Sequence, residues 1–250
     1  MQAKPGVPLE HMDWIGQYIV DKKPDVIVCI GDFADMPSLS SYDKGKKSFE
    51  GRRYKDDIAA SIEGMTRLLA PLKAYNAHKR AMKEKAYKPR MVLTLGNHED
   101  RIRRAVEDDA KIEGVISVDD LQFEKFGWEV YPFLQPVNID GVLYAHYFTS
   151  GVMGRPVTSA RALVKAKHCS ATMGHVQTVD IFMGDSTPDG RPLIGLFAGV
   201  CYLHDEDYLG YQGNNCRRQI VMCHEVENGS YDPMFVSLSY LQRKYGRKAA

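Results

Sequence analysis

The sequence is short of cysteine, of long apolar runs and of net charge, and each shortage excludes a class of protein. Its five cysteines are an odd number and none forms a CxxC pair, which indicates reduced thiols in a cytoplasmic protein. The apolar runs are far shorter than the roughly 20 residues of a membrane-spanning helix, and no signal-peptide pattern begins the chain. A net charge of +1 gives no overall attraction to nucleic acid or to an anionic membrane.

The remaining composition is that of a globular protein with a full core. The chain has 250 residues, of which 44% are hydrophobic and 26% are charged. We find no internal repeat, no low-complexity block and no clear linker. The sequence therefore predicts one domain over residues 1–250.

Four short apolar segments each end in a polar residue that can bind a metal. Short apolar runs of this kind are typical of buried strands. The ends of strands are where α/β folds place their chemistry. The segments are Val26–Ile30 before Asp32, Met91–Leu95 before Asn97, Val142–Ala145 before His146, and Ala171–Gly174 before His175.

Helical patterns alternate with strands early in the chain, and strands dominate later. We expect helices over residues 8–23, from Tyr54 to a kink or break at Pro71, and from Leu72 to about residue 87. We expect a helix opened by Pro156, and strands over 193–198, 219–226 and 234–240 in a second sheet. The pattern predicts an α/β fold with mixed sheets inside and helices outside. Residues 36–90 are interpreted as a loop plus helical lid insertion, and the acidic stretch 204–207 as a solvated loop.

The four strand-end residues form a ligand set for a divalent metal. Asp32 offers a carboxylate, Asn97 an amide oxygen, and His146 and His175 two imidazoles. This mixture suits Mn, Fe or Zn better than Ca, and we favour Mn. A metal held in this way lowers the pKa of bound water, which can then attack phosphorus.

These residues also carry a family resemblance. The segments Gly31-Asp32-Phe33-Ala34-Asp35, Gly96-Asn97-His98-Glu99 and Gly174-His175-Val176-Gln177 resemble the GDxxD, GNHE and GHxH motifs of calcineurin-like metallophosphoesterases. The resemblance covers Val26 to Gln177 in the order of the family, with His146 between the last two motifs. The compact form with an inserted lid resembles phage-encoded members.

The resemblance implies a fold and a role for each motif residue. The fold would be two mixed β-sheets packed as a central sandwich flanked by helices. Asp32 would bridge two metals, while Asn97, His146 and His175 would complete one metal site. His98 would protonate the leaving alkoxide, and Asp35 would orient His98, as expected for a carboxylate that fixes the tautomer of a general acid.

Two positions depart from the family pattern. Gln177 stands where the GHxH motif has its second histidine. The family begins with a DxH motif after a first strand, and here Gln2 stands where its histidine would be. Gln2 and Gln177 are therefore possible, weaker ligands of a second metal. We expect the native reading frame to start before Met1 and to supply the missing first strand.

The arginines after His98 extend the candidate site. Arg101 and Arg104 are predicted to neutralise a substrate phosphate, because guanidinium groups match phosphate oxygens in a bidentate manner. The sequence thus predicts a phosphoesterase that hydrolyses phosphomonoesters or phosphodiesters with metal-activated water, acting on a phosphoester substrate such as a nucleotide or nucleic acid and not at a membrane.

Two alternatives stay open. The chain could be a pseudoenzyme, or binding module, with a degraded second metal site. It could also be a DNA-directed nuclease, for which the basic stretch Leu72 to Lys88 and the arginines after His98 are the evidence.

Overall fold

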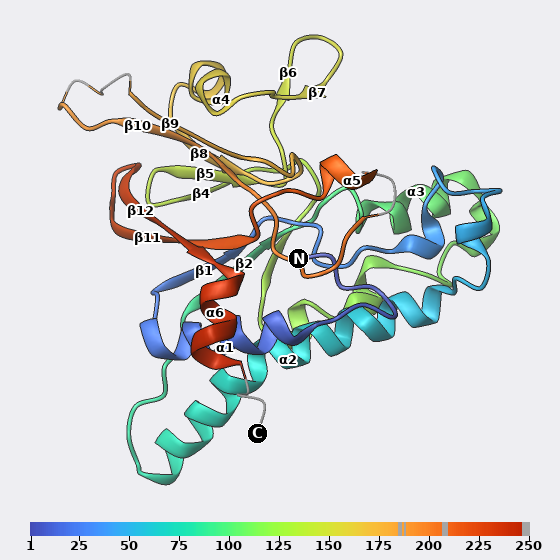
Figure 1. Cartoon of the computed structure of the whole chain (residues 1–250), viewed down its shortest axis with the longest axis horizontal. Coiled ribbons are helices and arrows are strands. Elements are labelled where there is room, and N and C mark those ends of the chain that lie inside the picture. Colours follow the sequence, from blue (N-terminus) through green and yellow to red (C-terminus); the bar gives the residue numbers. More distant parts are fainter. Residues whose placement is uncertain (185–186, 188, 207–209, 247–250) are drawn as a thin grey trace.

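The chain has a mixed α/β fold with several sheets and outer helices (Figure 1). The structure is a computed structural model and describes residues 1–184, 187, 189–206 and 210–246. The described strands form a three-stranded sheet, a five-stranded sheet and two two-stranded ribbons. No helix in the described ranges combines the length and the apolar character needed to cross a membrane.

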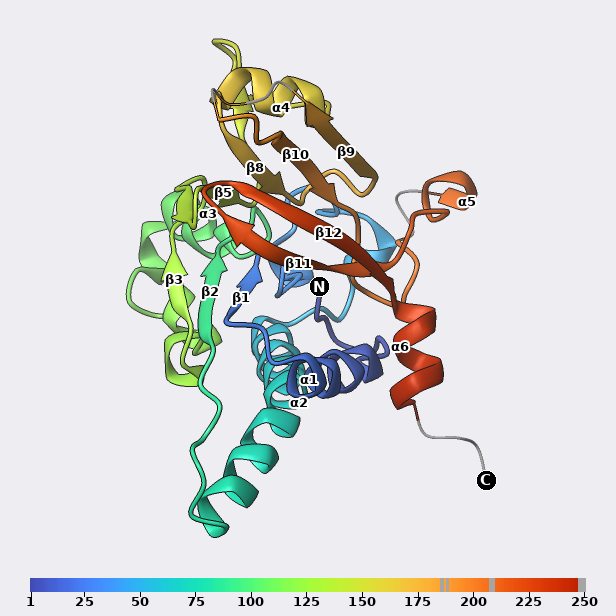
Figure 2. The same cartoon turned by 90° about the vertical axis from the view of Figure 1, so that its left-hand side faces the viewer.

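The first sheet was expected to be mixed, but its described strands are all parallel and have the order β1-β2-β3. Its strands are β1 (Val26–Cys29), β2 (Arg90–Thr94) and β3 (Glu129–Tyr131). The apolar runs predicted at 26–30 and 91–95 are therefore confirmed as strands. Helices α1 (Glu10–Lys22) and α2 (Tyr54–Ala81) pack below this sheet in Figure 2, in a core that includes Ile15, Met65 and Leu93.

Helix α2 corrects one expectation. Pro71 was predicted to kink or break the helix and a second helix to follow from Leu72, but α2 runs through Pro71 as one helix of 28 residues. The reason lies in α1: a Cβ on Gly16 would lie 2.3 Å from the carbonyl oxygen of Leu68 and 2.9 Å from Pro71 Cγ. The two helices are thus in close contact at the proline, and this packing holds the helix together where local propensity would end it.

The second sheet is mixed and has the order β4-β5-β8-β10-β9. The inner pairs β5–β8 and β8–β10 are parallel, and the outer pairs are antiparallel. The strands are β4 (Val137–Ile139), β5 (Val142–Ala145), β8 (Ser170–Met173), β9 (Val179–Gly184) and β10 (Leu193–Ala198).

Helix α4 (Ala160–Lys167) covers the outer face of this sheet, where Leu163 packs with Phe197 and Met173. Pro156 was expected to open this helix, but it lies in β7 (Arg155–Pro156), which pairs with β6 (Thr149–Ser150). The helix begins later because the Ser159 side chain accepts a hydrogen bond from the N–H of Ala162.

The inner faces of the two sheets share one apolar cluster. Val92 of β2 packs there with Val142 of β5 and Ile194 of β10. Successive side chains of a strand point to opposite faces, so Leu93 faces the helices while Val92 faces the second sheet. The carboxyl ends of β1, β2, β5 and β8 consequently meet in one region.

The last part of the chain forms a hairpin and a helix rather than more of the second sheet. Strand β11 (Gln219–Glu227) pairs with β12 (Ser230–Ser237), and α6 (Leu238–Tyr245) follows. The expected strand over 234–240 ends at Ser237, whose side chain accepts from the N–H of Tyr240 and caps the helix. The other helical segments are α3 (Asp100–Asp108), α5 (Gly210–Gly213) and 3-10 turns at Pro37–Leu39, Lys47–Phe49, Ala110–Ile112, Val118–Leu121 and Glu124–Phe126.

Candidate metal centre

Two glycines allow the turns after β1 and β2 to approach each other. A Cβ on Gly96 would lie 2.1 Å from Asp32 Oδ1, and a Cβ on Gly31 would lie 2.7 Å from His146 Nδ1. Gly31 also has φ +86°, and Asp32 has φ +50°, so the chain turns sharply after β1. Glycine at both positions lets the Asp32 carboxylate sit directly against the turn that carries Asn97.

A buried carboxylate, Glu99, joins these two turns. It is fully buried and accepts hydrogen bonds from the N–H groups of Asp32 (3.0 Å), Ala34 (2.8 Å) and Gly96 (2.8 Å). Burial, followed by the charge of Asp32, raises the pKa of Glu99. Glu99 belongs to the motif Gly96-Asn97-His98-Glu99, but the sequence predicts no role for it, because nothing local shows that its partners lie on another strand end.

The four predicted ligands come together at this point. Asn97 Oδ1 lies 2.9 Å from His146 Nε2 and 2.9 Å from His175 Nδ1. His146 Nε2 lies 3.3 Å from Asp32 Oδ2. One ligand atom each of Asp32, His146 and His175 falls within 4.8 Å of the others. The predicted group of one carboxylate, one amide oxygen and two imidazoles is therefore a single cluster that could bind a metal ion.

The hydrogen bonding of His146 shows why this cluster fits a cation. Its Nδ1 lies 2.9 Å from the carbonyl oxygen of Ile30, so Nδ1 carries the proton and donates it there. In the neutral form of the ring, Nε2 would present a lone pair toward two oxygens that are acceptors as well, on Asp32 and Asn97. Burial and the neighbouring His146 lower the pKa of His175 to about 4, which keeps that ring neutral. Lone pairs that converge in this way suit a divalent metal.

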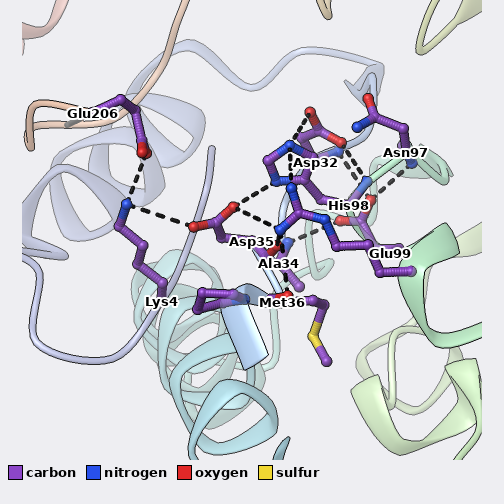
Figure 3. A network of polar contacts seen from close by, with 12 residues as sticks. Lys4, Asp32, Ala34, Asp35, Met36, Asn97, His98, Glu99 and Glu206 are labelled. Atoms are coloured by element: carbon purple, nitrogen blue, oxygen red, sulfur yellow. Dashed lines mark hydrogen bonds and ion pairs between the residues drawn. The ribbon is translucent and has the colours of Figure 1, made fainter. Parts of the chain in front are cut away.

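Beside the cluster lies the predicted pair of His98 and Asp35 (Figure 3). His98 Nδ1 is 2.5 Å from Asp35 Oδ1, and His98 Nε2 is 3.8 Å from Asp32 Oδ2. Burial lowers the pKa of His98, but the carboxylates of Asp32 and Asp35 outweigh it and hold that pKa above its ordinary value. Burial acts upward on Asp35, yet its contacts with His98, Lys4 and Arg101 bring its pKa far below the usual range.

The two predicted phosphate-binding arginines occupy different places. Arg101 donates to the carbonyl oxygens of Asp35 (2.7 Å) and Met36 (3.3 Å), and its Nη2 lies 3.3 Å from His98 Nε2. Arg104 donates to the carbonyl oxygen of Asn97 at 3.0 Å. Arg101 is thus next to His98, and Arg104 supports the turn that carries Asn97. Their contact with a substrate stays a prediction.

The two glutamines lie near the cluster and line the same cavity of about 760 Å³ as Asp32, His146 and His175. Gln2 is buried, and its N–H donates to the carbonyl oxygen of Asp32 at 2.7 Å. Its Oε1 is buried without a hydrogen-bond partner among the described residues. Gln177 is half-buried, two residues after His175. An orphaned amide oxygen at Gln2 is compatible with the predicted second ligand position.

The sequence did not predict that Asp35 is linked through Lys4 to Glu206, a residue late in the chain. Lys4 Nζ lies 3.5 Å from Asp35 Oδ2 and 2.8 Å from Glu206 Oε1 (Figure 3). Glu206 Oε1 also contacts His204 Nε2 at 2.8 Å. The stretch 204–207 was expected to be a solvated loop, but Glu206 is buried because it pairs with Lys4. Asp207 lies outside the described residues.

Comparisons with known proteins add one short match. No family model matches the chain. A segment of 57 residues is 44% identical to the Gene 54 protein of Mycobacterium phage D29. The match covers 23% of this chain and 21% of the phage protein, so it extends over about a fifth of either. What the chain has in common with that protein is one segment of its sequence.

Proposed function

We propose that the protein is a metal-dependent phosphoesterase, which hydrolyses phosphomonoesters or phosphodiesters by means of metal-activated water. The observation that carries this proposal is the juxtaposition of the ligand cluster with a buried acid pair. His98 Nε2 lies 3.8 Å from Asp32 Oδ2, and His98 Nδ1 is held by Asp35 at 2.5 Å. A proton donor beside a metal site is what cleavage of a phosphoester requires.

The proposed fold is the metallophosphoesterase sandwich, built here from a parallel first sheet and a mixed second sheet with helices on both outer faces. In its support, Val92, Val142 and Ile194 of the two sheets share one apolar cluster. The motif residues lie at strand ends, as that architecture would require. The short match to a phage protein agrees with the proposal of a phage-encoded member. Five free cysteines support a reducing cytoplasmic compartment.

The residues of the site have distinct tasks in this proposal. Asp32, Asn97, His146 and His175 would hold a divalent metal, Mn²⁺ by preference or else Fe or Zn, which supplies a water of lowered pKa and neutralises phosphate charge. His98 donates its Nε2 proton to the leaving oxygen. Asp35 accepts from His98 Nδ1–H, which fixes the ring and leaves Nε2 facing the cluster. Arg101 contributes positive charge beside that proton donor.

The neutral ligands Gln2 and Gln177 make a second metal site weaker than the first. Amide oxygens replace imidazoles there and carry no charge, so they hold a cation less strongly. We therefore propose that the first site carries the reaction. The pseudoenzyme alternative predicts metal binding without turnover. The hydrolysis assay described below therefore distinguishes a pseudoenzyme from a phosphoesterase.

The nuclease alternative is not favoured by the position of the basic stretch. The exposed residues Lys73, Arg80 and Lys83 lie on the last turns of α2 and just beyond. The chain leaves that end of α2 to begin β2, so it lies at the opposite end of the strands from Asn97 (Figure 2).

The test is hydrolysis of a chromogenic phosphodiester and a chromogenic phosphomonoester by the purified chain. Turnover with Mn²⁺ that is lost on chelation and in His98→Ala would support the proposal. His78→Ala, which alters an exposed histidine of α2, serves as the matched control and should retain turnover. Metal binding without turnover of either substrate would contradict the proposal and favour the binding module.

A further inference from the structure

Lys4 is a largely buried cation that lies between two carboxylates. Its Nζ is 3.5 Å from Asp35 Oδ2 and 2.8 Å from Glu206 Oε1 (Figure 3). Only 18% of the Lys4 side chain is exposed, and the side chains of Asp35 and Glu206 are 8% and 9% exposed. Charges withdrawn from water in this way need partners, because their desolvation is costly. The two ion pairs therefore fix the ammonium group between Asp35 and Glu206.

The two carboxylate oxygens of Asp35 have separate partners. Oδ1 lies 2.5 Å from His98 Nδ1 and 3.6 Å from Arg101 Nη1, whereas Oδ2 faces Lys4. The Asp35 N–H donates to the carbonyl oxygen of Ala3 at 3.0 Å, so the backbone next to Lys4 is bound to Asp35 as well. The last torsion of an aspartate side chain is soft, and contacts at both oxygens restrict it. Lys4 supplies the contact at Oδ2.

Glu206 is anchored by the chain that follows β10. The Glu206 N–H donates to Asn214 Oδ1 at 2.8 Å, and Asn214 Nδ2 donates to the Glu206 carbonyl oxygen at 2.9 Å. His204 Nε2 lies 2.8 Å from Glu206 Oε1, and the His204 ring stacks on Tyr202 with the ring centroids 4.6 Å apart. The carboxylate that contacts Lys4 is thus held in place from its own side of the site.

Lys4 also separates two negative charges. Burial acts to raise the pKa of Glu206, and so does the charge of Asp35, but contacts with His204 and Lys4 outweigh both and lower it. Without the ammonium group, the carboxylates of Asp35 and Glu206 would repel each other in surroundings of low dielectric constant. The Asp35 carboxylate would lose its contact at Oδ2 and shift relative to His98.

We propose that Lys4 is a positioning residue for the His98–Asp35 pair and that Glu206 holds Lys4 in place. Lys4 keeps Asp35 Oδ1 directed at His98 Nδ1, so that His98 Nε2 faces Asp32 of the ligand cluster. The effect of Lys4 on turnover rests on the proposed phosphoesterase function. Its effect on the contact between His98 and Asp35 does not.

Steady-state kinetics separate a positioning role from a merely structural one. We expect Lys4→Met to lower kcat about 10-fold, because a small displacement of a reacting group costs rate, while KM and Mn²⁺ affinity change little. Lys4→Arg keeps the positive charge and should restore most of kcat. Lys55→Met, which alters an exposed lysine of α2, is the matched control and should equal the parent. A kcat equal to that of this control, or a parallel loss of Mn²⁺ affinity, would overturn the proposal.

The double variant Lys4→Met/Glu206→Gln tests the repulsion between the carboxylates. Because glutamine carries no charge, the double variant lacks the repulsion that Lys4→Met alone creates. We expect its kcat to lie closer to that of the parent than the kcat of Lys4→Met does. Two changes that only weakened the fold would add their losses instead, and an additive loss would contradict the proposal.

Proton NMR of the metal-free full chain reads the contact of His98 with Asp35 without turnover. The His98 Nδ1 proton lies in a short, charge-assisted hydrogen bond, so its signal should appear far downfield and be absent in His98→Ala. We expect this signal to shift or broaden in Lys4→Met and to persist in Lys4→Arg and Lys55→Met. An unchanged signal in Lys4→Met would reject the role given to Lys4. A parent chain that shows the predicted changes but has no turnover would contradict the phosphoesterase function alone.

Discussion

His98 and Asp35 form a buried pair in which His98 Nδ1 lies 2.5 Å from Asp35 Oδ1. Their side chains are only 12% and 8% exposed. The contact fixes which ring nitrogen faces the ligand cluster, because Nδ1 is committed to the carboxylate and Nε2 is left to face Asp32. A pair of this geometry positions a proton rather than merely filling space.

Replacing the carboxylate tests that role. We expect Asp35→Asn to lower kcat about 100-fold, because an amide neither stabilises the protonated ring nor enforces its tautomer. KM and Mn²⁺ affinity should change little, since Asp35 does not belong to the ligand cluster. Steady-state kinetics and metal titration measure the three quantities. The control is Asp56→Asn, an exposed carboxylate of α2; a kcat equal to that of this control would contradict the role given to Asp35.

Metal binding at the ligand cluster should raise the thermal stability of the protein as well as support its activity. A metal present at 100 times its Kd stabilises the folded state by about 2.7 kcal/mol, which raises Tm by roughly 5 to 10 °C for a chain of this size. We expect Mn²⁺ to produce such a rise in the parent protein and little rise in His175→Ala. Thermal denaturation with and without Mn²⁺ measures this difference. A similar rise in both proteins would place the metal elsewhere, and His78→Ala should behave as the parent.

We expect Glu99 to contribute mainly to the stability of the fold. Its carboxylate accepts three buried backbone N–H groups, whereas the amide of Glu99→Gln offers one oxygen and brings an N–H₂ group against a donor. We expect the free energy of unfolding to fall by roughly 2 to 4 kcal/mol. Urea denaturation measures it, with Glu63→Gln on the exposed side of α2 as the control. A loss as small as that of the control would mean that the turns hold their geometry without Glu99.

Acid stability should depend on His11, which is fully buried in α1. Burial, followed by the positive charge of the N-terminus, lowers its pKa to about 3 from 6.5. Below about pH 6.5, His11 is protonated in the unfolded chain but stays neutral in the folded chain. The free energy of unfolding therefore falls as the pH falls from 6.5 towards 3. Each pH unit in that window contributes up to about 1.4 kcal/mol.

The variant His11→Gln removes this proton uptake. Between pH 7.5 and pH 5, the loss in unfolding free energy should be smaller than in the parent by roughly 2 kcal/mol. Urea denaturation at the two pH values measures it, and His78→Gln should show the same loss as the parent. Equal losses in all three proteins would show that His11 is not the group that limits acid stability.

The sequence located the cluster because its ligands follow short apolar strands, and parallel strands bring their carboxyl ends together. Asp32, Asn97, His146 and His175 were predicted on that basis and lie in one group. The pairing of Lys4 with Glu206 was not predicted, because the two residues are 202 positions apart and only the folded chain brings them together. Pro71 was wrongly taken as a helix end, since the rule is local and the packing of α1 on α2 overrides it.

The three hydrogen bonds accepted by Glu99 would pre-organise the ligand cluster for metal binding. They fix the turn of Asp32 relative to the turn of Asn97 within the protein itself, without help from a bound cation. Binding would then need little ordering of the chain, and nearly all of the interaction energy would appear as affinity. Chelation should accordingly leave a folded protein whose ligand cluster keeps its arrangement and is ready to take up the ion again.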